Sequence, residues 1–147
     1  EQARRVFGQR GNLDFVHHDM LDPELPLEGA DIIVVASAIQ YVPDPARLIT
    51  VWLRSLAAHG EIHILDSPIY ERAEIAPARE RTWRHYAAIG VPEMTGTYHH
   101  HGWDSLEPFE VDVLHRPDAS VARFRRRVLG SARSPFPWIR ISKDGNR

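Results

Sequence analysis

Side chains that can exchange protons follow one of the strand-like segments of this sequence. Asp66 directly follows the predicted strand 62–65, Tyr70 lies four residues further on, and residues 99–101 are three consecutive histidines. A carboxylate, a phenol or an imidazole can accept the proton of an oxygen or nitrogen nucleophile. Asp66, Tyr70 and His100 are therefore the candidate catalytic residues, although a carbon or amine nucleophile can react without a base.

The nine histidines could also suggest a metal site, but the spacing argues against one. The chain has no cysteine, which excludes disulfides, thiolate metal sites and cysteine nucleophiles. Alternate side chains on a strand point to opposite faces, so the run 99–101 cannot direct three rings at one ion. His17 and His18 lack partners at a known ligand spacing. We expect no metal, and a place in a substrate pocket or capping loop for one histidine of the run.

A strand–helix–strand pattern must position these groups. The run 31–36 is rich in β-branched residues and is typical of a strand that is buried on both faces. Asp44 before Pro45 predicts a helix start, and an apolar stripe continues to Leu56, with Gly60 as the stop. Residues 62–65 then form the next strand. The short connections predict a βαβ unit with two parallel strands.

Further elements are expected on both sides of this unit. They are a helix end at 1–10, a short strand at Leu13–His17, a helix over 78–89, a strand over 109–114, an arginine-rich helix over 119–129 and a last strand over 136–141. Trp83 and Tyr86 share the stripe of the 78–89 helix, so packing in the core is their favoured use.

The composition indicates a soluble domain. The 147 residues are 43% hydrophobic and 26% charged, with a net charge of −2. No apolar run approaches the roughly 20 residues that span a bilayer, so we expect a cytoplasmic protein without a membrane partner. Residues 116–147 carry nine basic and two acidic side chains. No aromatic residues alternate with these arginines, so we expect no nucleic-acid partner.

A series of short motifs keeps a characteristic order and spacing through the first 70 residues. The motifs are Phe15–Met20, Leu25–Leu27, Ala30–Val34, Gln40–Pro45 and Leu56 followed by Gly60–Ile62. Together they resemble the central part of the S-adenosylmethionine-dependent methyltransferases of the Rossmann-like class (class I). Beyond Tyr70 the resemblance rests on a general pattern of helices and two closing strands.

The resemblance implies the fold and the cofactor. The fold would be α/β, a Rossmann-like three-layer sandwich with a mostly parallel sheet and antiparallel final strands. S-adenosylmethionine would be the cofactor: Asp19 would accept a hydrogen bond from the adenine amino group and Met20 would contact the ring. Ser37 and Ala38, at the carboxyl end of a strand, would meet the methionine end.

The resemblance also divides the chain and indicates its partner. Residues 1–70 would be the cofactor-side core, 71–106 a substrate-capping region, and 107–147 the closing strands and the basic helix. The partner would be a small-molecule methyl acceptor, apolar or aromatic, because aromatic residues are frequent in the capping region. The oligomeric state has no signature in the sequence.

Parts that such enzymes possess are missing from these residues. The full fold begins with a strand and a glycine-rich turn that lets the backbone approach the cofactor, and no G-x-G cluster occurs here. We therefore expect an incomplete domain, the C-terminal portion of a longer enzyme, without the first two strands and inactive as an isolated piece. One alternative is a non-catalytic methyltransferase-like interaction or assembly module. A third is another Rossmann-like enzyme, such as a nicotinamide-dependent one.

Overall fold

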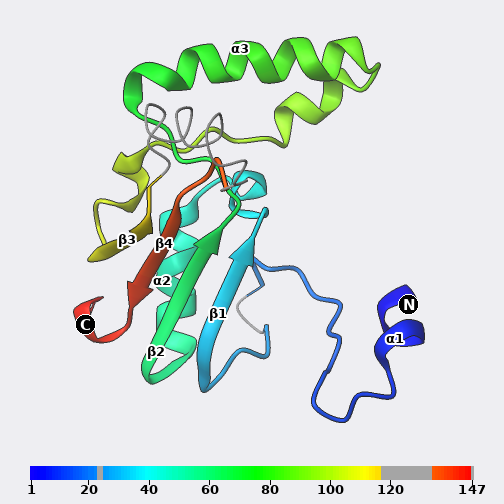
Figure 1. Cartoon of the computed structure of the whole chain (residues 1–147), viewed down its shortest axis with the longest axis vertical. Helices are drawn as coiled ribbons and strands as arrows, with labels where there is room; N and C mark the ends of the chain where they lie inside the picture. Colours follow the sequence, from blue (N-terminus) through cyan, green and yellow to red (C-terminus); the bar gives the residue numbers. More distant parts are fainter. Residues whose placement is uncertain (23–24, 117–133, 147) are drawn as a thin grey trace, which may run out of the picture.

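The computed structural model describes residues 1–22, 25–116 and 134–146, which form an open four-stranded sheet with helices (Figure 1). The strand order is β1-β2-β4-β3. The strands are β1 (Ala30–Ala36), β2 (Leu56–Leu65), β3 (Val111–His115) and β4 (Trp138–Ser142). β1 and β2 are parallel, whereas β4 is antiparallel to both of its neighbours. The predicted α/β class, with a parallel start and antiparallel final strands, is confirmed.

The predicted βαβ unit is present, with different boundaries. The side chain of Asp44 accepts a hydrogen bond from the Arg47 backbone N at 2.9 Å and so caps α2 (Pro45–Ser55). α2 ends at Ser55 instead of continuing toward Gly60, because β2 already begins at Leu56 and pairs with β1 there. A Cβ atom at Gly60 would lie 2.9 Å from the Ala30 carbonyl oxygen, so glycine permits this close approach.

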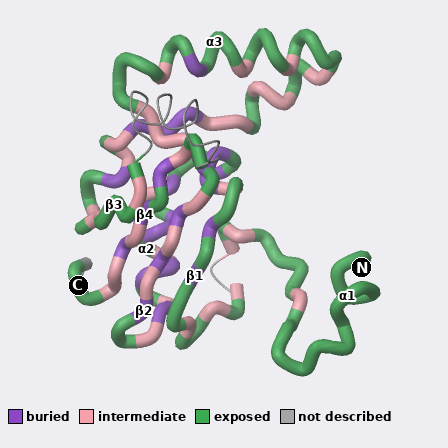
Figure 2. Tube along the Cα trace, in the orientation of Figure 1, coloured by how far each residue is buried: buried purple, intermediate pink, exposed green. Residues whose placement is uncertain are grey.

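The hydrophobic core lies between α2 and one face of the sheet. Ile62, Ile139 and Ile141 have no exposed surface there, and they belong to one cluster with Leu48 and Ile49 of α2. Figure 2 shows this buried layer running through β2, β4 and α2. Burial of such side chains is the main source of stability for a sheet–helix pair.

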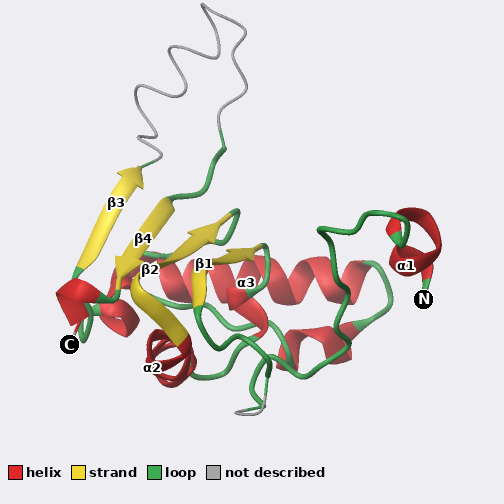
Figure 3. Cartoon of the chain, turned by 90° about the horizontal axis from the view of Figure 1, so that it is seen from below, coloured by secondary structure: helices red, strands yellow, loops and turns green. Residues whose placement is uncertain are grey.

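Among the described residues, the opposite face of the sheet is exposed along β1 and partly exposed along β2 and β4. Ile32 and Val34 of β1 are 59% and 57% exposed, so the prediction of a strand buried on both faces is wrong. The physical reason is that α2 covers one face only (Figures 1 and 3). Two of the three predicted layers are therefore seen among the described residues: the sheet and the helical layer formed by α2. A second helical layer on the opposite face is not seen among them.

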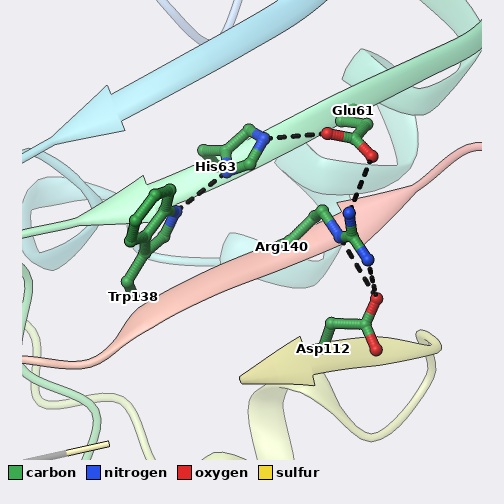
Figure 4. Close-up of polar contacts among 5 residues, drawn as sticks. All are labelled: Glu61, His63, Asp112, Trp138 and Arg140. Atoms are coloured by element: carbon green, nitrogen blue, oxygen red, sulfur yellow. Dashed lines mark hydrogen bonds and ion pairs between the residues drawn. The ribbon is translucent and has the colours of Figure 1, made fainter. Parts of the chain in front are cut away.

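A chain of polar contacts crosses that exposed face (Figure 4). Trp138 Nε1 donates to His63 Nδ1 at 2.9 Å, and His63 Nε2 lies 3.0 Å from Glu61 Oε2. Arg140 joins Glu61 Oε1 at 3.2 Å to Asp112 Oδ2 at 2.7 Å. These contacts connect β2, β4 and β3, and their partial exposure makes each contribute only modestly to stability.

The N-terminal segment lies to one side of the sheet (Figure 1). It contains α1 (Gln2–Phe7), which confirms a helix within residues 1–10. The strand predicted at Leu13–His17 is absent, because no described strand lies beside it to satisfy its backbone groups. Leu13 and Val16 are exposed.

Helix α3 (Arg72–Ala88) lies beyond the carboxyl ends of β1 and β2 (Figure 1). It starts earlier than the predicted 78–89 because Glu71 and Glu74 form a reciprocal capping box. Trp83 is 54% exposed, so its predicted place in the core is wrong. Tyr86 is half-buried and its ring contacts Tyr98.

Short 3₁₀ helices complete the described structure: η1 (Ile39–Tyr41), η2 (Pro92–Gly96), η3 (Trp103–Leu106) and η4 (Asp144–Asn146). The strands predicted over 109–114 and 136–141 correspond to β3 and β4. The arginine-rich helix predicted over 119–129 lies outside the described residues. None of the described helices has the length and apolar character that crossing a membrane requires.

Candidate active site

Two neighbouring strand ends carry unusual backbone conformations. Ser37 follows β1 with φ 52°, and Asp66 follows β2 with φ 48°. The Ser37 backbone N donates to the Leu65 carbonyl at 3.0 Å, and the Ser37 hydroxyl donates to the Asp66 carbonyl at 3.2 Å. Non-glycine residues in the left-handed region cost of the order of 1–3 kcal/mol and concentrate at functional sites. The structure thus brings together two of the predicted site residues.

The capping region is attached to these strand ends by backbone hydrogen bonds. The His99 N donates to the Gln40 carbonyl at 2.7 Å, and the Tyr70 N donates to the His101 carbonyl at 2.9 Å. Tyr70 also forms an isolated bridge with Gly102. Through these contacts the histidine run, far along the chain, lies beside the segment that follows β2.

Tyr70 and His100, two predicted catalytic residues, are neighbours within an aromatic cluster. Their ring centroids are 5.6 Å apart, and the His100 ring is 5.1 Å from that of Tyr98. Tyr98 also makes edge contacts with Tyr41 at 5.8 Å and Tyr86 at 6.4 Å. The sequence predicts aromatic residues in the capping region, but it does not predict that these four tyrosine rings and the histidine ring pack against one another.

Burial controls the protonation of the cluster. Burial, the largest cause, raises the pKa of Tyr98 to about 12 and raises that of Tyr70, where Arg81 partly opposes the shift. Both hydroxyls therefore stay protonated at neutral pH and can donate hydrogen bonds. Burial, followed by Arg79, lowers the pKa of His100. Its ring is neutral at neutral pH and can accept a proton.

The surroundings of His100 fix its ring. The residue is buried, and its Nε2 lies 2.9 Å from the Thr82 hydroxyl on α3. Asp66 differs, since its carboxylate is exposed and accepts a hydrogen bond from the Ser134 hydroxyl at 3.0 Å. Ser134 was not predicted, because a serine in a proline-rich turn gives no local signal for a contact with Asp66.

The residues expected to hold a cofactor occupy two kinds of position. Asp19 is exposed, and its carboxylate accepts a hydrogen bond from the Leu21 N at 2.9 Å, as a turn residue does. Met20 and Ala38 are half-buried against the core. Gln40 is a further candidate: its buried amide nitrogen donates to the Ser37 carbonyl at 2.8 Å, and its Oε1 has no partner in the described structure.

The described residues line two open cavities, one of which includes a predicted site residue. One, of about 590 Å³, lies between α3 and residues 95–101 and includes His100 in its wall. The other, of about 640 Å³, lies near the C-terminal end of α2 and contains none of the predicted site residues. Within the described ranges, no group of three or more ligating side chains is arranged to hold a metal ion.

Comparisons with known proteins agree with this architecture. The family model described as "Methyltransferase domain" matches residues 1–64. No curated protein matches the chain. Among solved structures, the chain resembles a SAM-dependent methyltransferase from Thermotoga maritima, described as a possible histamine N-methyltransferase. The two are 19% identical with a TM-score of 0.53, and the match covers 97% of this chain and 70% of that one. The fold is therefore the Rossmann-like α/β fold of a SAM-dependent methyltransferase.

Proposed function

We propose that this chain forms part of an enzyme that transfers a methyl group from S-adenosylmethionine to a small-molecule acceptor. The observation that carries the proposal is the pair of strained strand ends, Ser37 and Asp66, which are joined by a hydrogen bond. Residues 99–101 are hydrogen-bonded to the segments that follow both strands. Ligands of open α/β sheets bind beyond the carboxyl ends of parallel strands. The methyltransferase-domain match over residues 1–64 supports the same chemistry.

The residues present fit one end of the cofactor. Ser37 and Ala38 form the turn after β1, and the buried Gln40 Oε1 beside this turn lacks a donor among the described residues. An ammonium group such as that of the methionine end would satisfy this oxygen. Asp19 and Met20 are proposed to contact the adenine. When bound, S-adenosylmethionine would supply an electrophilic methyl group on a positively charged sulfur.

The protein's part in this reaction is alignment and proton transfer. The residues that would hold the cofactor and the acceptor would align the acceptor atom with the methyl carbon. An oxygen or nitrogen acceptor must also lose a proton. We propose that neutral His100 takes this proton, which requires its Nε2 to exchange the Thr82 hydroxyl for the acceptor, while protonated Tyr70 can donate a hydrogen bond that orients the acceptor. Asp66, whose side chain is exposed, is proposed as a second candidate for the base.

A small aromatic acceptor suits the capping region. The rings of Tyr41, Tyr70, Tyr86 and Tyr98 gather near His100. The structural neighbour's description names a possible histamine N-methyltransferase, an activity on a small aromatic amine. We propose an acceptor of similar size, with no nucleic-acid or membrane partner.

We further propose that the chain acts as the C-terminal part of the enzyme. β1 has a hydrogen-bonded neighbour on one side only, and its outward side chains Ile32 and Val34 are exposed. An apolar strand with an open edge usually requires cover. Cover by the missing first strands of the same domain would place the glycine-rich turn beside Ser37.

A non-catalytic methyltransferase-like module is the second candidate. It is favoured by one observation, the lack of a G-x-G cluster in these 147 residues. Calorimetric titration of the full-length gene product with S-adenosylmethionine, then with a nicotinamide cofactor, distinguishes the three proposed functions. Saturable heat with the first supports the proposal, heat with the second supports another Rossmann-like enzyme, and no heat with either supports the module.

A further inference from the structure

The three consecutive histidines of the capping region make different contacts. The His100 Nε2 lies 2.9 Å from the Thr82 hydroxyl of α3. The rings of His99 and His101 instead stack on each other, with their centroids 5.9 Å apart and their planes at 26°. Successive side chains of an extended backbone point in opposite directions, so this alternation is expected. His101 therefore contacts a different part of the molecule from His100.

The ring and the carbonyl of His101 bind two different segments of the chain. The residue is 8% exposed. Its ring forms hydrogen bonds with the backbone of Ile39 and of Val42, which lie in η1 and at its C-terminal cap, after β1. Its carbonyl accepts a hydrogen bond at 2.9 Å from the N of Tyr70, which lies after β2. One residue thus connects the segments that follow the two parallel strands.

The His101 ring is the donor in its contacts with η1. Burial, the largest cause, and then the neighbouring His99 lower the pKa of His101, whereas the hydrogen bonds to Ile39 and Val42 oppose this shift. A hydrogen bond that favours the protonated imidazole is one in which the ring N–H donates to a carbonyl. A side chain of similar volume without an N–H would therefore lose both contacts.

The two segments that His101 connects belong to the two ends of the proposed active site. η1 closely follows Ser37, and the amide nitrogen of Gln40 in η1 donates to the Ser37 carbonyl at 2.8 Å. The His99 N donates to the Gln40 carbonyl at 2.7 Å, so a backbone contact accompanies that of the ring. On the other side, Tyr70 supplies one ring of the aromatic cluster. His101 therefore joins the proposed cofactor end to the proposed acceptor end.

We propose that His101 is a positioning residue that couples the turn after β1 to the capping region. Its ring holds η1 and its carbonyl holds Tyr70, so a ligand that orders one segment also orders the other. The choice of S-adenosylmethionine as that ligand rests on the proposed function. The attachment of both segments stands on the contacts of His101 alone.

Hydrogen–deuterium exchange of the full-length protein without a cofactor tests the attachment. His101→Leu has a similar side-chain volume and no N–H, and the amides of residues 39–42 should exchange about 2- to 10-fold faster in this variant. The Tyr70 amide should also exchange faster, although the substitution leaves its partner, the carbonyl of residue 101, in place. Unchanged exchange in the buried strand β2 would show that the variant is folded. His101→Gln keeps a side-chain N–H and should lose less protection.

His99→Gln is the matched control. His99 binds Gln40 through its backbone N, which the substitution retains, so the exchange rates of residues 39–42 and Tyr70 should stay close to those of the wild type. Wild-type exchange rates at these positions in His101→Leu would overturn the inference.

Addition of S-adenosylmethionine at saturation tests the coupling. In the wild type, exchange should slow both at residues 37–42 and at residues 99–103. In His101→Leu, slowing should remain at residues 37–42 only, a result that a general loss of stability would not produce. Slowing at residues 99–103 that persists in this variant would overturn the inference. A folded protein with no response to S-adenosylmethionine would contradict the proposed function, and the cofactor-free comparison would then decide whether His101 holds both segments.

Discussion

The Ser37 hydroxyl donates a hydrogen bond to the Asp66 carbonyl at 3.2 Å, and both residues have left-handed backbone conformations. Each is the first residue after its strand, so the bond joins the carboxyl ends of β1 and β2. Left-handed conformations of non-glycine residues are energetically unfavourable. Their presence at two adjacent strand ends indicates that the surrounding structure holds the backbone in place there.

The first prediction concerns the conformation of Ser37. Ser37→Val places a β-branched side chain at φ 52° and should lower the free energy of unfolding by about 1–3 kcal/mol. Ser37→Asn is the matched control, because asparagine tolerates the left-handed region, and it should lose much less. Urea denaturation measures both. Equal losses in the two variants would show that the backbone conformation is not the cause.

The two faces of the sheet should respond differently to truncation. Ile62→Ala removes a fully buried side chain between the sheet and α2 and should cost about 2–5 kcal/mol of unfolding free energy. In the 147-residue chain by itself, Ile32→Ala, on the exposed face, should change it by less than about 0.5 kcal/mol. Denaturation of the two variants under one set of conditions tests this contrast. A large loss for Ile32→Ala would show that this face is covered in the protein studied.

Stability should fall in mild acid because of two buried histidines. Burial lowers the pKa of His100 and of His101 below the ordinary value of 6.5. Below pH 6.5 the unfolded chain therefore binds more protons at these positions than the folded chain does, so stability decreases as pH falls from about 6.5 toward the lowered folded values. The stabilising contribution is fully present above that range.

The unfolding free energy at pH 7.5 and pH 5.5 checks the histidine prediction, and the difference should be smaller in His101→Gln than in the wild type. His101→Gln is informative even if it is less stable, because the difference between the two pH values is the quantity compared. A wild-type protein that is more stable at pH 5.5 than at pH 7.5 would contradict the assignment.

The catalytic role proposed for His100 predicts a specific loss. With an acceptor that must lose a proton, His100→Gln should lower kcat by about 10²- to 10⁴-fold, a typical contribution of a general base. His99→Gln is the neighbouring control and should retain most of the activity. The pH profile of kcat provides a second readout, since the acidic limb assigned to His100 should disappear in His100→Gln. A limb that persists unchanged would assign the base elsewhere.

The elements that the sequence predicts correctly have local causes. Asp44 and Pro45 specify the start of α2, and the apolar run 31–36 specifies β1, because both signals lie within a few adjacent residues. Local sequence signals were not sufficient to decide whether Leu13–His17 forms a strand. Its residues alternate as a strand requires, but a strand exists only beside a partner, and the described residues provide none.

The site was harder to predict than the fold, because its contacts join distant positions. Asp66 meets Ser134 across 68 residues of sequence, and Tyr70 is bound to the backbone of His101. The Gln40 Oε1 atom lacks a hydrogen-bond partner in the described structure because the surrounding residues bury it. No spacing rule within a single element reports such burial.

Binding of S-adenosylmethionine tests the central claim most directly. The full-length gene product, shown to be folded by cooperative unfolding, should give saturable binding in a calorimetric titration and should transfer a labelled methyl group to a small aromatic acceptor. Ser37→Val should weaken this binding, since it disturbs the turn proposed to meet the methionine end. A folded full-length protein that gives no binding heat with S-adenosylmethionine would contradict the account.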